Sequence, residues 1–162
     1  MKVTVKKSPV IVPGFRFSGV ACGLKASGKR DLSLLVSDVP ATAVAAFTTN
    51  RVKAAPVAIG EERLRTGHLQ AIVVNSGNAN ASTAQPGLKL AQDSCALVGR
   101  ELAIDAQLVL PSSTGVIGVL PDWQKMRTGI PAAVAALSPR GFWNAVAGIM
   151  TTMPFPRSRL DR

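Results

Sequence analysis

The chain has 162 residues, of which 47% are hydrophobic and 17% charged, and its net charge is +10. This length allows one domain with one sizeable core, and the apolar content excludes global disorder. No run of eighteen apolar residues occurs, so we expect no membrane-spanning helix. The opening apolar run, Pro9 to Pro13, is too short for a secretory signal, and we therefore expect a cytoplasmic protein.

The positive charge would attract anions, among them nucleic acid. However, seven Lys and Arg precede Asp31, and Arg157, Arg159 and Arg162 fall in the last six residues, which favours solvated chain ends. Aromatic residues make up 4% and Tyr is absent, so few aromatic side chains are available for stacking on bases. Nucleic-acid binding is therefore disfavoured. Two Cys and one His are too few for a four-ligand zinc site.

The first half of the chain is dominated by short apolar runs between turn residues, which predict buried strands. The predicted strands are residues 15–24, 31–37, 43–49 and 71–74. Between the first two, Gly23 to Arg30 (GLKASGKR) nearly spells a phosphate-binding loop. It lacks the Ser or Thr after the Lys and precedes a strand, not a helix, so we interpret it as a basic hairpin turn.

The second half shows helical spacing. Apolar residues at steps of three and four predict a helix face made of Leu88, Ala91, Cys95, Val98 and Leu102. Ser82 and Gln85 are typical of a capping box at its start. Trp123 begins a second predicted helix, which Pro131 would interrupt, and Ser138-Pro139 is expected to cap a third. Strands followed by helices favour an α/β layered domain.

Two polar segments follow predicted strands. Asn75, Ser76, Gly77 and Asn78 could present amide, hydroxyl and N–H groups to a ligand, or could be a turn chosen for left-handed backbone angles. The run 108–110 predicts a strand that ends at Thr114 and Gly115, a good place for an oxyanion hole, although the spacing alone does not require one. His68 and Glu61-Glu62 are not spaced as a general acid–base pair.

Five motifs in chain order resemble the N-terminal part of the ornithine acetyltransferase family, the bifunctional glutamate N-acetyltransferases of arginine biosynthesis. They are AFTTN at 46–50, AAPV at 54–57, VNSGNAN at 74–80, STGVIG at 113–118 and GIMTT at 148–152. The resemblance runs from about Gly14 to Thr152. It implies an α/β layered sandwich with β-sheets between helix layers, of which this chain would hold an incomplete part.

The chemistry that the resemblance implies is acetyl transfer. A precursor cuts itself at an Ala–Thr bond into α and β chains, and the N-terminal Thr of β carries acetyl from N-acetylornithine to glutamate. The family's oxyanion pair falls on Thr114 and Gly115, and its substrate-binding Thr falls on Thr152 or Thr151, of which we favour Thr152. No metal and no cofactor are required, and acetyl-CoA is the donor in members that also act as synthases.

The resemblance ends near Thr152. The family's Thr-Thr-Asp-Thr-x-Pro-Lys is replaced by TTMPFPR at 151–157, and the scissile Ala–Thr and the β chain do not follow. We therefore expect residues 1–152 to be an α-chain-like portion and residues 153–162 a divergent, disordered tail. A truncated gene is favoured over a split one, and the nucleophile would come from a β chain. Two alternatives stay open: an inactive fragment, and a basic nucleic-acid-binding module.

Overall fold

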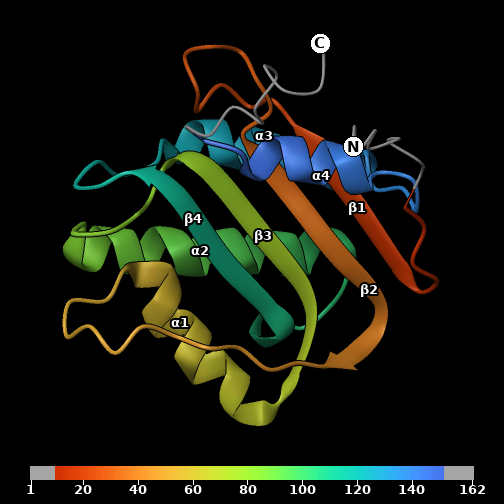
Figure 1. Ribbon diagram of the computed structural model, residues 1–162, viewed down its shortest axis with the longest axis horizontal. Helices are drawn as coiled ribbons and strands as arrows, with labels where there is room; N and C mark the ends of the chain where they lie inside the picture. The colour runs from red at the N-terminus through yellow and green to blue at the C-terminus, as the bar shows by residue number, and fades with distance from the viewer. Residues whose placement is uncertain (1–9, 152–162) are drawn as a thin grey trace, which may run out of the picture.

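The computed structural model describes residues 10–151, and its strands form one mixed sheet in the order β1-β2-β3-β4 (Figure 1). The strands are β1 (Phe15–Val20), β2 (Leu32–Thr42), β3 (His68–Asn78) and β4 (Val109–Val116). Strand β2 runs antiparallel to both β1 and β3, whereas β4 runs parallel to β3. A parallel neighbour needs a long crossover, which helix α2 (Ala84–Leu102) supplies.

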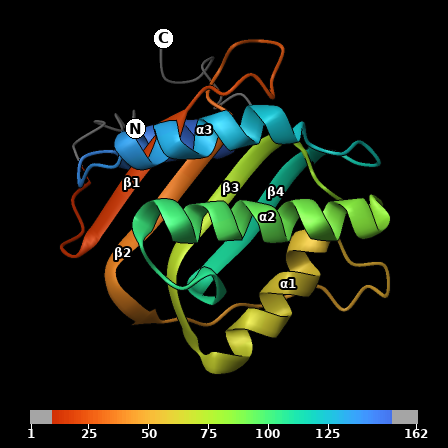
Figure 2. The same cartoon turned by 180° about the vertical axis from the view of Figure 1, so that it is seen from behind.

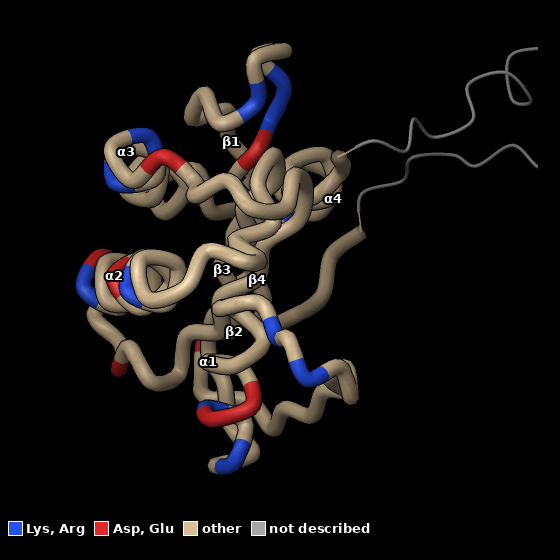
Figure 3. The backbone as a smooth tube through the Cα atoms, turned by 90° about the vertical axis from the view of Figure 1, so that its left-hand side faces the viewer, with Lys and Arg blue, Asp and Glu red and all other residues tan. Residues whose placement is uncertain are grey.

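Helices cover both faces of this sheet. Helices α2 and α3 (Trp123–Ala135) lie side by side on one face, as Figures 2 and 3 show, and α4 (Phe142–Ile149) lies on the other across β1 and β2. Helix α1 (Ala55–Arg63) packs beside β4 and α2, and short 3₁₀ turns span Leu64–Thr66 and Ala106–Leu108. The α/β layered class is therefore confirmed. Residues 10–151 form one sheet, so the further sheet of the expected sandwich is not made by this part of the chain.

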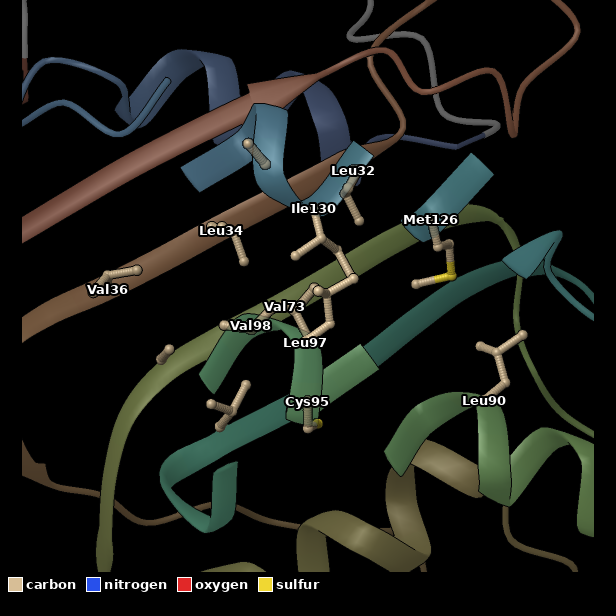
Figure 4. Close-up of a cluster of buried hydrophobic side chains, with 13 residues drawn as sticks. Leu32, Leu34, Val36, Val73, Leu90, Cys95, Leu97, Val98, Met126 and Ile130 are labelled. Atoms are coloured by element: carbon tan, nitrogen blue, oxygen red, sulfur yellow. The ribbon is translucent and has the colours of Figure 1, made fainter. Parts of the chain in front are cut away.

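The main core lies between the sheet and the helices α2 and α3 (Figure 4). Alternate residues of β2 and β3 point to this face, as the two-residue period of a strand requires. Leu34 and Ile130 are fully buried there, and complete burial of each such side chain contributes roughly 1.5–3 kcal/mol. Cys95 is also fully buried on α2, which confirms that it packs as a small core residue.

Helix α4 approaches the opposite face so closely that the contact requires glycine. A Cβ at Gly19 of β1 would lie 1.9 Å from the carbonyl oxygen of Asn144. The hydroxyl of Ser33 donates to the carbonyl of Ala145 at 2.8 Å, and a Cβ at Gly148 would lie 2.1 Å from that hydroxyl oxygen. Small residues on both elements therefore set the position of α4.

Several expected strands and strand ends differ from the structure. The prediction of a strand over 43–49 is wrong, because this segment is an extended loop in which Val44 is 93% exposed. The strand expected at 71–74 is longer, since β3 begins at His68 and includes the polar residues up to Asn78. Helix α1 was not anticipated, because Pro56 and Gly60 interrupt any clear apolar periodicity in its nine residues.

The helix predicted over 88–102 is confirmed, but its cap is not the one expected. Ser82 has a positive φ of 56° and makes no capping bond, and Thr83 stands at the N-cap position. The buried side chain of Asn80 holds this turn instead. It accepts a bond from the hydroxyl of Thr83 at 2.7 Å and donates to the carbonyl of Gly87 at 2.9 Å.

The two later helices also begin and end differently from the expectation. Helix α3 continues through Pro131 to Ala135, so the expected interruption does not occur. Helix α4 begins at Phe142, not at the Ser138-Pro139 pair. Ser138 instead pairs with Phe17 of β1 through reciprocal main-chain bonds at 2.9 and 3.0 Å.

Candidate functional site

The carboxyl ends of β3 and β4 bring the two polar segments of the sequence together. Because the strands are parallel, their residues lie side by side in register. The pairs are Asn75 with Ser113, Ser76 with Thr114, Gly77 with Gly115 and Asn78 with Val116. The segment 75–78 is therefore a strand end next to the expected oxyanion pair, and not a free loop.

The side chains of these strand ends alternate between the two faces. The hydroxyl of Ser76 donates to the carbonyl of Gly148, which places it on the α4 face. Thr114 shares this face because lateral neighbours in a sheet point the same way, and its side chain is half-buried. The α4 face of the sheet thus carries the hydroxyls of Ser76 and Thr114 next to each other.

Asn75 and Ser113 lie on the other face and are occupied with each other. The hydroxyl of Ser113 donates to Oδ1 of Asn75 at 2.5 Å, and the amide of Asn75 donates to the carbonyl of Asn78 at 2.9 Å. Asn75 is only 2% exposed. These two side chains therefore hold the ends of β3 and β4 together. Within the segment 75–78, Ser76 places a hydroxyl on the same face of the sheet as Thr114.

Gly115 can occupy its position only because it has no side chain. Its φ is +130°, and a Cβ there would lie 2.4 Å from the carbonyl carbon of Gly77, whose own φ is +114°. Gly115 is exposed, so a ligand can reach this end of the strand. A half-buried hydroxyl beside an exposed glycine main chain is the kind of donor pair that stabilises a developing oxyanion.

Thr151 follows the C-terminal end of α4 and is exposed. Two contacts hold that end close to β3: the Ser76 hydroxyl on Gly148, and the ammonium of Lys25 on the carbonyl of Met150. Thr151 therefore lies on the same side of the molecule as Thr114. Thr152, the favoured substrate-binding residue, lies outside the described residues, as does the tail 153–162.

Loop 21–30 connects β1 to β2 and confirms the interpretation as a hairpin turn. A feature that sequence reasoning missed holds it in place, namely the buried carboxylate of Asp31. Oδ1 accepts from the main-chain N–H of Cys22 at 2.7 Å, and Oδ2 accepts from that of Lys25 at 2.9 Å. Its carbonyl accepts from the N–H of Ser76 at 2.8 Å, so Asp31 links the loop to the site.

Within residues 10–151, the other reactive side chains do not form a catalytic group. Burial, with a smaller contribution from Asp31, raises the pKa of Cys22 to about 12, and burial raises that of Cys95 to about 11. Both thiols therefore stay protonated and are poor nucleophiles. His68 contacts the carbonyl of Thr66, and Glu61 is ion-paired with Lys53 at 2.6 Å, so neither forms an acid–base pair.

Among residues 10–151, no group of three or more His, Cys, Asp and Glu side chains is arranged to hold a metal ion. No helix in this range is long and apolar enough to span a membrane. Within the described part of the chain, Lys and Arg are distributed over loops and helices at several places on the backbone, not gathered on one element (Figure 3). This distribution does not provide the continuous basic stripe that a nucleic-acid surface needs.

The α4 face of the sheet carries an apolar groove of about 350 Å³ beside the part that α4 covers. Its apolar lining includes Val12, Phe15, Phe17, Leu35 and Ile72. The last residue of β4 and the loop that follows it are also apolar and open: Val116 is 58% and Ile117 66% exposed. The groove lies against residues 69–72, in the N-terminal half of β3, and not at the site at 75–78. Exposed apolar surface is typical of a face that another polypeptide covers.

Comparison with known proteins identifies the family. The sequence profile of the ArgJ family matches residues 16–161. The chain is 46% identical over 146 residues to the arginine biosynthesis bifunctional protein ArgJ of Geobacter sulfurreducens, a match that covers 90% of this chain and 37% of that protein. A similar match, 45% identical, is found to the protein of the same name from Symbiobacterium thermophilum, of which the chain covers 38%. The chain thus spans little more than a third of these relatives.

Two solved structures share the fold. Ornithine acetyltransferase from Mycobacterium tuberculosis, complexed with ornithine, is 38% identical with a TM-score of 0.84, and the match covers 87% of this chain and 77% of that one. The arginine biosynthesis bifunctional protein ArgJ from Bacillus halodurans is 34% identical with a TM-score of 0.80, covering 87% and 74%. On both the sequence and the structural evidence, this chain belongs to the ArgJ family.

Proposed function

We propose that this chain forms the α-chain part of an acetyl-transfer site that moves acetyl from N-acetylornithine to glutamate in arginine biosynthesis. The observation that carries the proposal is the β3–β4 register, which sets Thr114 beside Ser76 and the exposed Gly115 beside Gly77 in a chain of the ArgJ family. Thr114 and Gly115 would supply the oxyanion hole. Thr152, with Thr151 next to it, would bind the substrate.

The proposed reaction has two steps. A Thr hydroxyl attacks the acetyl carbonyl of N-acetylornithine, the amide C–N bond breaks, and ornithine leaves with the hydroxyl proton on its amine. The amine of glutamate then attacks the resulting ester and regenerates the hydroxyl. In each step negative charge develops on the acetyl oxygen, where the Thr114 hydroxyl and the Gly115 N–H would donate.

The nucleophile would come from a β chain. The match covers 77% of the solved Mycobacterium tuberculosis chain but only 37% of the Geobacter sulfurreducens protein, which supports an enzyme assembled from more than one polypeptide. The apolar groove at Phe15, Leu35 and Ile72, and separately the exposed Val116 and Ile117, are apolar surfaces on which a β chain would pack. We propose that the reaction needs no metal or cofactor and that acetyl-CoA can serve as a second acetyl donor. We also propose that the protein acts in the cytoplasm.

Co-expression tests the proposal. The chain is produced together with the portion of the Geobacter sulfurreducens relative that lies beyond the matched segment, and each is also produced alone. We expect transfer of labelled acetyl from N-acetylornithine to glutamate only when both polypeptides are present. An assembled pair without transfer, or robust transfer by these 162 residues alone after removal of host enzyme, would refute the proposal.

A further inference from the structure

We propose that Lys25 is a positioning residue of the candidate site: its ammonium holds the main chain at Met150 and thereby fixes where Thr151 emerges beside β3 and β4. This inference rests on the proposed function for its catalytic meaning. Its structural basis does not depend on that function, because it is a contact within the fold. The contact joins Lys25 and Met150, which are 125 positions apart in the sequence.

The ammonium of Lys25 closes the end of α4. A helix leaves its last carbonyls without partners, and a cation near that end is favourable. Here the Lys25 ammonium donates to the carbonyl of Met150, directly after the last helical residue, and the Ser76 hydroxyl donates to that of Gly148. The Lys25 ammonium also donates to the carbonyl of Arg30 at 2.8 Å, so it spans the gap between loop 21–30 and α4.

The loop that carries Lys25 is itself anchored to the site. The buried carboxylate of Asp31 accepts the main-chain N–H of Lys25 at 2.9 Å, and the carbonyl of Asp31 accepts the N–H of Ser76 at 2.8 Å. Ser76 is the register partner of Thr114. One connected set of bonds therefore runs from the Thr114 strand pair through Asp31 and Lys25 to Met150.

This arrangement explains why a Lys stands there. Helix α4 has only eight residues and ends at Ile149, so little of its own structure holds the chain that follows. Without the ammonium, the main chain at Met150 would lose its partner from the loop, and the exposed Thr151 would adopt several positions. A residue that binds substrate from such a segment needs a fixed main chain, because small misplacements cost binding and rate.

The contact can be observed through a single resonance. Among the four Met residues only Met150 precedes a Thr. A chain labelled with carbonyl-¹³C Met and ¹⁵N Thr therefore gives one carbonyl–nitrogen correlation, from the Met150–Thr151 peptide bond. We expect Lys25→Met to move the Met150 carbonyl resonance upfield, because hydrogen bonding deshields the carbonyl carbon. Lys25→Arg should restore it, and Lys25→Gln should give an intermediate value.

Lys29→Met is the matched control, because it removes an exposed positive charge from the same loop. It should leave the Met150 resonance in place. The inference is overturned if Lys25→Met leaves that resonance unchanged, or if Lys29→Met moves it as far.

The effect on catalysis is measured by steady-state kinetics of the assembled pair of polypeptides. Lys25→Met should raise KM for N-acetylornithine by about fivefold or more while kcat changes by less than about twofold, with recovery in Lys25→Arg. Unchanged KM and kcat, in a pair where the resonance has moved, would overturn the positioning role. If the wild-type pair transfers no acetyl, the proposed function fails, whereas the Met150 resonance still decides whether Lys25 holds this segment.

Discussion

Replacing Asp31 by Asn tests how much the buried carboxylate contributes to the fold. Asp31 is fully buried and accepts two main-chain N–H bonds, one on each carboxylate oxygen, at 2.7 and 2.9 Å. Asn has one acceptor oxygen, so its amide nitrogen would face one of these N–H groups. A buried unsatisfied N–H costs about 1–3 kcal/mol, and the remaining bond loses its charge assistance.

Together these two effects predict that Asp31→Asn lowers the free energy of unfolding by roughly 2–4 kcal/mol. Asp38→Asn is the matched control. Asp38 is ion-paired with Arg16 at 3.0 Å but its side chain is 54% exposed, so the loss should be below about 1 kcal/mol. The assay is urea unfolding followed by tryptophan fluorescence and circular dichroism, with equal slopes required of all three proteins. Equal midpoints for the two variants would refute the reasoning.

Three further predictions follow from the site, the thiols and the β1–α4 contact. Thr114→Val in the assembled pair should lower kcat about a hundredfold, roughly 3 kcal/mol, while Thr152→Val should mainly raise KM; equal effects on both parameters would contradict these roles. Because raised pKa values leave less thiolate, Cys22 should react with iodoacetamide at pH 8 about a thousandfold and Cys95 about a hundredfold more slowly than free cysteine, until urea unfolds the chain. Gly19→Ala should displace α4 and lower the unfolding midpoint, and a crystal structure with α4 unmoved would refute this.

The sequence predicts those parts of the sheet that have an apolar run of their own. The predicted strands at 15–24 and 31–37 overlap β1 and β2, although β1 ends at Val20 and β2 continues to Thr42, and the run at 71–74 lies within β3, because short apolar runs between turn residues mark buried strands. The polar residues Asn75 to Asn78 follow no such pattern. They are strand residues because β4 pairs with them, and that pairing joins segments about forty residues apart.

Local sequence preferences mislead at two helices. Ser82 and Gln85 have the spacing of a capping box, yet the buried Asn80 holds the start of α2. Pro131 does not end α3, whose buried residues include Ile130 on one side of it and Ala133 on the other. At α2 a neighbouring Asn replaces the expected cap, and at α3 burial on both sides of Pro131 outweighs the cost of about 3 kcal/mol of a proline inside a helix.

The candidate site also combines residues that the sequence indicates with residues that only the structure reveals. Thr114 and Gly115 are identified by resemblance, and the structure adds that Ser76 lies beside Thr114 and that Gly115 has no room for a side chain. Asp31 and Lys25 belong to no motif that indicates this site: Lys25 lies in the loop interpreted as a basic hairpin turn. Their importance comes from contacts with Ser76 and Met150, which are distant in the sequence, so sequence patterns alone could not have indicated them.

The most direct test of the account is the rate at which acetyl reaches the nucleophilic Thr of the β chain. The pair is mixed rapidly with N-acetylornithine, quenched, and analysed by intact mass for the addition of one acetyl group. The account predicts that the β chain is acetylated only in the presence of this chain, and about a hundredfold more slowly with Thr114→Val. Equal acetylation of the β chain with and without this chain, or with Thr114→Val and wild type, would contradict the claim that these residues form the oxyanion hole.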